Sequence, residues 1–258
     1  MMSRASVALS GLLTLLALLV LWQAVSVIFD IPAYIVPAPL AVLKEIALKP
    51  GFYIEQAAVT LRSTLLGFLL ATVLGLLFGT ITAYSRLFRL TLYPLILLLQ
   101  GVPKVALAPV LIIFLGFGLK FQVVVIASVA FFPVVVNAVM GLTTVDRDLI
   151  MLSRVLRTPR LREFWMIGLP HAAPSVFSGM KVAMTLSVIG AVVAEFVSSE
   201  AGLGHALMIA NSEFNTAMSF AAILLLSLMS FALFGLIRLI EWRAVPWAED
   251  AAVDRTAG

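Results

Sequence analysis

The chain has 258 residues, of which 62% are hydrophobic and 12% are charged, and its mean hydropathy is +1.14. Ordinary soluble domains carry roughly 25% charged residues, so the 17 Lys+Arg and 13 Asp+Glu of this chain cannot cover a soluble surface of this size. The composition therefore predicts an integral membrane protein, excludes a disordered or collagen-like chain, and gives no reason to expect a nucleic-acid partner from a net charge of +4.

The first apolar run covers residues 5–29 and follows the single charge of Arg4. A secretory signal peptide has an apolar region of about 7 to 15 residues, whereas this run has the roughly 20 residues needed to cross a bilayer. We therefore predict a retained first span at about 7–29. The next segment, 30–56, contains prolines and charges of both signs, so we predict an extramembrane loop with a short helix near 40–48.

Further apolar runs predict five more spans, at about 57–84, 92–117, 121–142, 175–197 and 218–240. The run at 92–117 contains Pro94, Pro103 and Pro109, which we expect to interrupt its helix. The fold class predicted for residues 1–258 is a single all-α transmembrane domain with six spans, so both termini lie on the same side of the membrane.

Cytoplasmic segments of membrane proteins carry an excess of Lys and Arg, and this rule fixes the expected orientation. If the N-terminus is cytoplasmic, the outer segments hold Lys44, Lys49 and Lys120. The inner segments then hold Arg4, Arg86, Arg89, Arg147, Arg154, Arg157, Arg160, Arg162, Arg238, Arg243 and Arg255. We therefore predict a multi-pass protein with cytoplasmic N- and C-termini.

The segment 146–170 is longer than a simple connection between two spans requires. Apolar Ile150, Leu152 and Leu156 lie among arginines in an amphipathic helical pattern, and Thr158-Pro159 predicts a turn. A helix of this kind fits a groove on another protein or lies among anionic lipid headgroups, and these residues alone leave both interpretations open.

This segment resembles the coupling motif of permease subunits of ATP-binding-cassette (ABC) importers. The motif reads Glu-Ala-Ala, three residues, Gly, nine residues, Ile, one residue, Leu-Pro. In the same register this chain has Met151-Leu152-Ser153, then Arg157, then Ile167-Gly168-Leu169-Pro170. The end of the motif matches, whereas Met151 replaces its Glu and Arg157 replaces its Gly.

Further matches, separated along the chain and in the same order, resemble the nitrate, taurine and sulfonate branch of these permeases. They are Ile35-Val36-Pro37-Ala38-Pro39, Thr60-Leu61-Arg62 before Gly67-Phe68, Gly101-Val102-Pro103 with Pro109 and Gly116-Phe117-Gly118, Phe131-Phe132-Pro133 with Asn137 and Gly141, and Ala194-Glu195-Phe196 with Gly202-Leu203-Gly204. Together they cover nearly the whole chain, so the resemblance does not depend on any one motif.

The resemblance implies the smaller type I, MetI-like permease fold in a bacterial inner membrane. It also implies four kinds of partner: a second copy of this chain, a cytoplasmic ABC ATPase dimer, an extracytoplasmic solute-binding protein and the lipid bilayer. The residues expected to couple to the ATPase are Met151, Leu152, Ser153, Leu156, Arg157, Thr158, Ile167, Leu169 and Pro170.

The chain has no Gly-x-x-x-x-Gly-Lys-Ser/Thr sequence, so ATP and Mg are expected on the partner ATPase, and this chain is expected to be no enzyme and to bind no cofactor. It has no cysteine, and His171 and His205 lack the carboxylate spacing of a metal site. We therefore predict neither a metal site nor a catalytic residue.

Charges within or near membrane spans are candidates for the translocation path. Arg62 attracts an anionic solute or extends its side chain to the outer surface, and Lys104 lines the path or binds carbonyls freed at Pro103. Lys181 is expected to be an anchor at the inner surface. Asn137 binds a solute or joins two helices.

The predicted gate lies at the outer end of the fifth span. It consists of Glu195 and a glycine turn containing Gly202 and Gly204, whose alternative interpretation is an ordinary helix end. The expected cargo is a small anion or small organic solute, such as a sulfonate, taurine, nitrate or a vitamin precursor. The alternative function is a secondary transporter or channel that works without ATP, for which the chain shows neither paired intramembrane carboxylates nor repeat symmetry.

Overall fold

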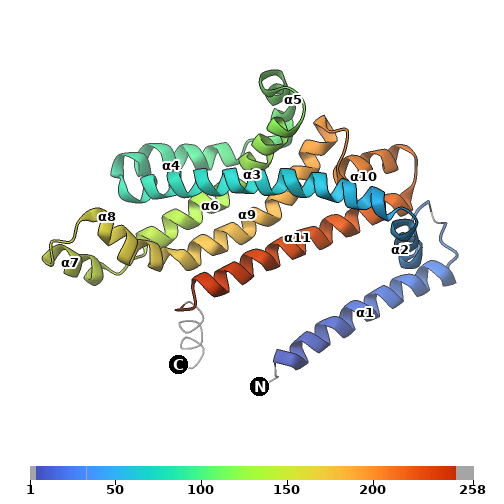
Figure 1. Cartoon of the computed structure of the whole chain (residues 1–258), viewed down its shortest axis with the longest axis horizontal. Helices are drawn as coiled ribbons and strands as arrows, with labels where there is room; N and C mark the ends of the chain where they lie inside the picture. Colours follow the sequence, from blue (N-terminus) through green and yellow to red (C-terminus); the bar gives the residue numbers. More distant parts are fainter. Residues whose placement is uncertain (1–3, 33, 248–258) are drawn as a thin grey trace. The chain divides into compact units, whose positions relative to one another are not determined.

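The computed structural model describes residues 4–32 and 34–247, and within these residues the regular structure is entirely helical (Figure 1). Arg255, one of the predicted cytoplasmic charges, lies outside the described residues. The helices are α1 (Arg4–Ile28), α2 (Pro39–Leu48), α3 (Pro50–Tyr84), α4 (Arg86–Gln100), α5 (Lys104–Leu115), α6 (Leu119–Thr143), α7 (Arg147–Val155), α8 (Arg160–Glu163), the π-helix η1 (Phe164–Gly168), α9 (Leu169–Ser198), α10 (Leu203–Ser212) and α11 (Thr216–Ala244).

Four helices in the described part of the chain are long and apolar enough to cross a membrane. They are α3, α6, α11 and the continuous helical segment 160–198, which contains α8, η1 and α9. Two shorter apolar helical segments, 16–28 and 106–115, fall within the predicted first and third spans. The all-helical membrane class is therefore confirmed, and four of the six predicted spans coincide with these four helices.

The predicted third span is divided because α4 ends at Gln100 and α5 begins at Lys104. Pro103 has no backbone N–H and lies in an extended conformation before α5, so one helix cannot continue through it. Pro94 and Pro109 lie inside α4 and α5 without ending them. Of the three prolines expected to interrupt this span, only Pro103 separates two helices.

The predicted loop 30–56 is also shorter than expected. Helix α2 forms where a short helix is predicted, but α3 already begins at Pro50, so residues 50–56 are helical. Proline is favoured in the first turn of a helix, because the N–H that it lacks would have no partner there. The prolines of this segment were therefore a poor guide to where the third helix begins.

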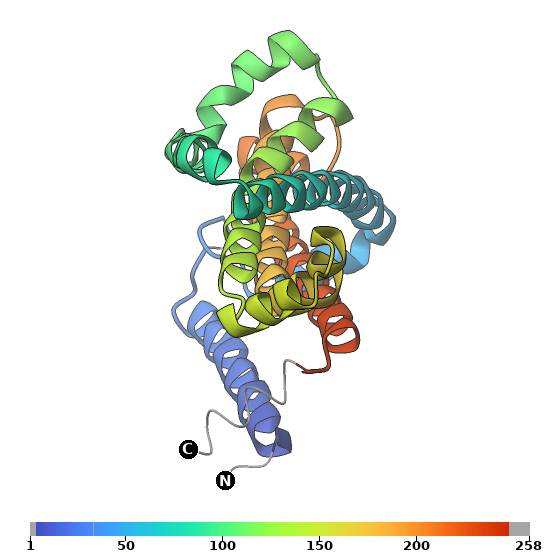
Figure 2. The same cartoon turned by 90° about the vertical axis from the view of Figure 1, so that its left-hand side faces the viewer.

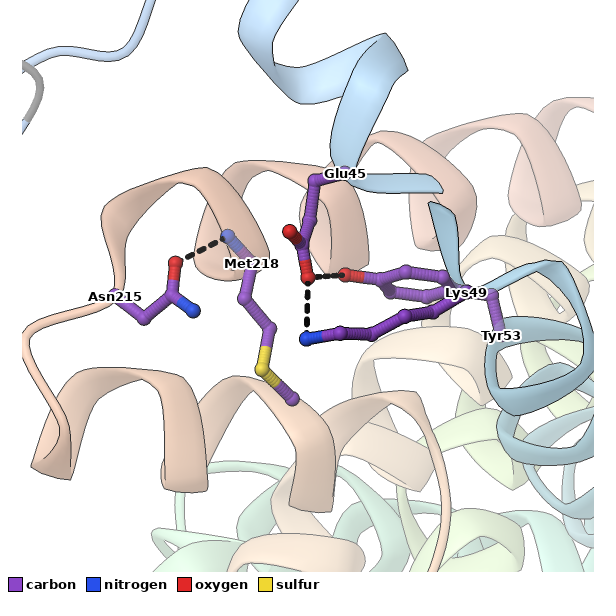
Figure 3. A network of polar contacts seen from close by, with 5 residues as sticks. All are labelled: Glu45, Lys49, Tyr53, Asn215 and Met218. Carbon is purple, nitrogen blue, oxygen red and sulfur yellow. Dashed lines mark hydrogen bonds and ion pairs between the residues drawn. The ribbon is translucent and has the colours of Figure 1, made fainter. Parts of the chain in front are cut away.

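Backbone contacts divide the chain into two compact units, residues 1–59 with 201–227 and residues 60–200 with 228–258. In the first unit, Glu45 of α2 accepts hydrogen bonds from Lys49 at 3.1 Å and from the Tyr53 hydroxyl at 3.5 Å (Figure 3). Asn215 caps α11 by accepting the N–H of Met218 at 3.1 Å. Met218 packs with Phe52, Ala206 and Ala210.

The second unit is built around α6 and α9, which lie side by side (Figure 1). Small residues let the backbones approach closely: a Cβ added at Gly179 of α9 would lie 2.7 Å from the Pro133 carbonyl oxygen of α6. Helix α3 meets α6 in the same way, because a Cβ at Gly79 would lie 2.6 Å from the Ala138 Cβ. Close packing of small residues is the usual means by which membrane helices associate.

Candidate functional site

The segment 146–170 folds as a helical hairpin between α6 and α9 (Figures 1 and 2). Asp146 caps the start of α7, and its carboxylate accepts the N–H of Asp148 at 2.9 Å, as expected of an aspartate at a helix N-cap. The short α8 and the π-helix η1 then lead directly into α9. A π-helical turn inside a longer helix is rare and is often found at functional sites.

The hairpin is closed from inside by Ser153 of α7 and Glu163 of α8. Ser153 is 3% exposed, and its hydroxyl donates to the Glu163 carboxylate and lies 3.0 Å from the Ile150 carbonyl oxygen. A buried hydroxyl with a charged acceptor makes a stronger hydrogen bond than two neutral groups do. Ser153, predicted to couple to the ATPase, therefore holds the hairpin together rather than forming part of its surface.

Helix α7 ends in a Schellman motif at Arg157. The N–H of Thr158 donates to the Ser153 carbonyl at 2.9 Å, and the N–H of Arg157 donates to the Arg154 carbonyl at 3.0 Å. The motif needs a left-handed residue at Arg157, and its φ is +50°. Glycine is usual at such a position, which explains why the family motif has Gly where this chain has Arg157.

Large apolar side chains cover the outside of the hairpin. Leu156 is 69% exposed and Val155 is 79% exposed, and both lie where α7 ends. The exposed apolar side chains of the hairpin, which we call the predicted coupling surface, are Leu149, Met151, Leu152, Val155, Leu156, Leu161, Trp165 and Met166. Of the other predicted coupling residues, Arg157 is exposed and Thr158 is partly buried in the turn between α7 and α8. Ile167, Leu169 and Pro170 are partly buried at the base of the hairpin, where η1 leads into α9.

The base of the hairpin rests on Tyr84, the last residue of α3, which sequence reasoning missed. The rings of Tyr84 and Phe164 meet edge to face with centroids 5.9 Å apart. A Cβ added at the buried Gly168 would lie 2.6 Å from the Tyr84 hydroxyl oxygen. The glycine within Ile167-Gly168-Leu169 therefore gives room to an aromatic residue from another helix, and no local pattern in the sequence indicates this contact.

Two candidates for the translocation path make contacts within their own stretch of chain. The Lys104 ammonium donates to the Leu99 carbonyl at 3.3 Å and to that of Gln100, at the end of α4. The Asn137 amide donates to the Pro133 carbonyl at 2.8 Å, within α6. The first contact is the one expected if Lys104 satisfies freed carbonyls, and the second does not by itself join two helices.

The other path and gate candidates occupy contrasting environments. Arg62 is exposed on α3, whereas Glu195 is fully buried in the last turns of α9. Gly202 precedes α10 as its N-cap with φ of +120°, a conformation that requires glycine. Its N–H donates to the Gln56 side-chain oxygen at 2.6 Å. Gly204 is buried in the first turn of α10. The two glycines thus form a sharp, well-defined helix start.

Comparison with known proteins gives a consistent result over most of the chain. The family of binding-protein-dependent transport system inner membrane components matches residues 71–245. A riboflavin transport system permease protein of Chloroflexus aurantiacus is 34% identical over 91% of this chain and 88% of its own length. A formylaminopyrimidine transport permease protein of Halalkalibacterium halodurans is 30% identical over 95% of this chain and 98% of its own.

Relatives named for aliphatic sulfonates, taurine and nitrate are also similar, at 29%, 27% and 28% identity. Among solved structures, the inward-facing MetNI methionine ABC transporter aligns with a TM-score of 0.64 at 20% identity, over 72% of this chain and 92% of that chain. At this identity the likeness concerns the fold, and it agrees with the helical arrangement described above.

Proposed function

Because the chain belongs to the family of binding-protein-dependent transport system inner membrane components, we propose that its hairpin 146–170 couples ATP hydrolysis on a partner to solute import. The chain is a permease subunit of an ABC importer, and its fold is that of the MetI-like permeases. The membrane-spanning helices form the passage, while the energy comes from a separate ATPase subunit.

The observation that carries this proposal is the predicted coupling surface. Exposed Leu156 and Val155 lie at the tip of a hairpin whose interior is fixed by Ser153 and Glu163. A rigid hairpin with apolar side chains outside and arginines between them has the chemistry of a helix that docks into a groove. Burying one leucine in such a groove contributes about 1.5–3 kcal/mol, so a few of these residues suffice for a stable contact.

The proposed assembly has two copies of this chain, two ATPase subunits in the cytoplasm and one solute-binding protein outside. ATP binding closes the ATPase pair and carries each hairpin as a lever, which opens the passage outward. Hydrolysis returns it to the inward state. ATP and Mg belong to the partner, and both termini of this chain lie in the cytoplasm.

The proposed cargo is a small anion or small organic solute, of the kind named for the relatives above. Exposed Arg62 offers a positive charge to an anion, and the residues proposed for the gate are Glu195 near the end of α9 and, separately, Gly202 and Gly204 at the start of α10. Most of the recognition is assigned to the binding protein, because a tight site within the passage would slow release of the solute.

The test is to purify the tagged chain from its native membrane in mild detergent and identify its partners by mass spectrometry. We expect the unmodified chain to recover a P-loop ATPase and Leu156→Asp to lose it at least tenfold, because a carboxylate cannot enter an apolar groove without a large desolvation cost. The matched control is Leu48→Asp, which places the same charge at a similarly exposed leucine of α2.

Two results would contradict the proposal. One is an unmodified chain that is repeatedly purified without an ATPase under conditions that preserve a known importer complex, which would favour ion-driven or passive transport. The other is equal recovery of the ATPase by Leu156→Asp and Leu48→Asp, which would remove the hairpin from the contact.

A further inference from the structure

An ion pair joins α9 to α11 inside the second unit. The Lys181 ammonium donates to the Glu241 carboxylate at 2.7 Å, and the two side chains are 22% and 18% exposed. Both residues lie on helices long and apolar enough to cross a membrane, where an unpaired charge is costly. Lys181 was expected to be an anchor at the membrane surface, but the structure gives it a specific partner 60 residues away.

A second contact joins the same two parts of the chain. Pro174 lies inside α9 and has no N–H, so the carbonyl of Pro170 lacks its regular helical donor. The indole N–H of Trp247, just beyond α11, donates to this carbonyl at 3.3 Å. Trp247 thus donates to the Pro170 carbonyl in place of the N–H that Pro174 lacks.

The two contacts are separated along both partners. Pro170 and Lys181 lie 11 residues apart on α9, about 16 Å along a helix, and Glu241 and Trp247 lie at the end of α11 and just after it. One contact would allow the two segments to pivot, whereas two contacts fix their relative orientation. Val245, which lies between Glu241 and Trp247 in the sequence, is 2% exposed. Ile237, one turn before Glu241 on α11, is 4% exposed.

Pro170 is also the last residue of the hairpin 146–170. Figure 1 shows the end of α11 beside the beginning of α9, where η1 leads out of the hairpin. We infer that Lys181, Glu241 and Trp247 form a clamp through which the end of α11 moves with the hairpin and α9 as one body. These three are positioning residues for transport, and the inference rests on the proposed coupling function.

The test measures whether the clamped segments move together. The chain has no cysteine, so spin labels can be placed at Ser178→Cys on α9 and Arg243→Cys on α11, both exposed positions. The labelled chain is diluted among unlabelled copies and assembled with the co-purified ATPase. The distance between the labels is then measured without nucleotide and with Mg-ATP trapped by vanadate.

For the otherwise unmodified chain we expect the mean distance to differ by less than about 2 Å between the two states. For the double variant Glu241→Gln with Trp247→Phe we expect the mean distances in the two states to differ by about 5 Å, roughly one helical turn. Trp242→Phe is the matched control, because it changes an exposed tryptophan in the last turn of α11, five residues before Trp247.

The exchanged pair, Lys181→Glu with Glu241→Lys, provides a variant that retains an ion pair. We expect it to restore the small difference in distance that is lost in Glu241→Gln alone, because the re-formed ion pair again joins α9 to α11. Two results would overturn the clamp: distances that differ between the two nucleotide states in the unmodified chain, or distances that are equal between them in the double variant.

Recovery of the ATPase is scored first. Its absence from the unmodified chain contradicts the proposed function, whereas normal recovery with unequal distances in the unmodified chain contradicts the clamp alone.

Discussion

Arg157 shows how one backbone angle explains a departure from a family motif. Its φ of +50° is imposed by the hydrogen bonds that end α7, and its side chain is exposed, so no side-chain packing requires an arginine there. An L-residue in this conformation costs roughly 1–2 kcal/mol relative to glycine, part of which glycine loses again through its greater freedom when unfolded. The hairpin therefore keeps the geometry of the motif without its preferred residue.

We predict that Arg157→Gly stabilises the end of α7 by about 0.5–1 kcal/mol. The backbone amides of residue 157 and of Thr158 should exchange their hydrogens about two- to fivefold more slowly, because these two N–H groups make the hydrogen bonds of the Schellman motif. Arg154→Gly is the control, because position 154 is helical and glycine there should speed exchange. Faster exchange in Arg157→Gly would show that the left-handed conformation carries no strain.

At the scale of helices, the contact of α3 with α6 depends on residues that have almost no side chain. Gly75 and Gly79 lie one turn apart, and Cβ atoms added to them would lie 2.7 Å from the Val134 Cβ and 2.6 Å from the Ala138 Cβ. At Gly235 of α11, no atom of the described residues lies within 4 Å of an added Cβ once its chain neighbours and the adjacent helix backbone are set aside. Replacing glycine by alanine should therefore have opposite effects on stability at Gly79 of α3 and at Gly235 of α11.

We predict that Gly79→Ala lowers the stability of the purified protein by about 1–3 kcal/mol, because the helices must separate to admit the methyl group. Gly235→Ala should raise it by roughly 0.5–1 kcal/mol through helix propensity alone. The measurement is the temperature at which half of the protein remains monodisperse in detergent. Adding Ala138→Gly to Gly79→Ala should recover most of the loss, and failure of this rescue would contradict the close contact.

At the scale of the whole molecule, the expected function needs the hairpin and the solute-facing loops on opposite sides of the membrane. The distribution of arginines predicts that the hairpin 146–170 is cytoplasmic and that the loop 198–217 is outside. The hairpin could not reach a cytoplasmic ATPase with the reverse orientation. The orientation is therefore a direct requirement of the mechanism proposed above.

We predict that Ser212→Cys reacts with a membrane-impermeant maleimide in spheroplasts, whereas Arg160→Cys reacts only after the membrane is permeabilised. Both positions are exposed, and the natural chain has no cysteine that would give a background signal. The unmodified chain is the control for labelling of other proteins. Labelling of Arg160→Cys before permeabilisation would reverse the topology and exclude the proposed contact with the ATPase.

The sequence by itself determined the class of protein, the family and the position of the hairpin. Apolar runs, arginine-rich connections and the Ile167-Gly168-Leu169-Pro170 end are local features, and the free energy of placing each run in lipid depends mainly on its own residues. The same local reasoning misjudged Pro94 and Pro109, which lie inside α4 and α5 without ending them, and it misjudged the start of α3 at Pro50. Proline is tolerated inside membrane helices and is favoured in the first turn of a helix.

Only the tertiary structure decided which residues meet across helices. The pairs Ser153 with Glu163, Lys181 with Glu241, and Trp247 with Pro170 carry no shared pattern in the sequence, since each depends on how helices are rotated and packed. Close approach at small residues such as Gly79 and Gly179 sets this rotation. The sequence alone thus predicted which segments cross the membrane and which connect, and four of the six predicted spans coincide with described helices long and apolar enough to do so. Packing determined which side chains close the hairpin and fasten it to its neighbours.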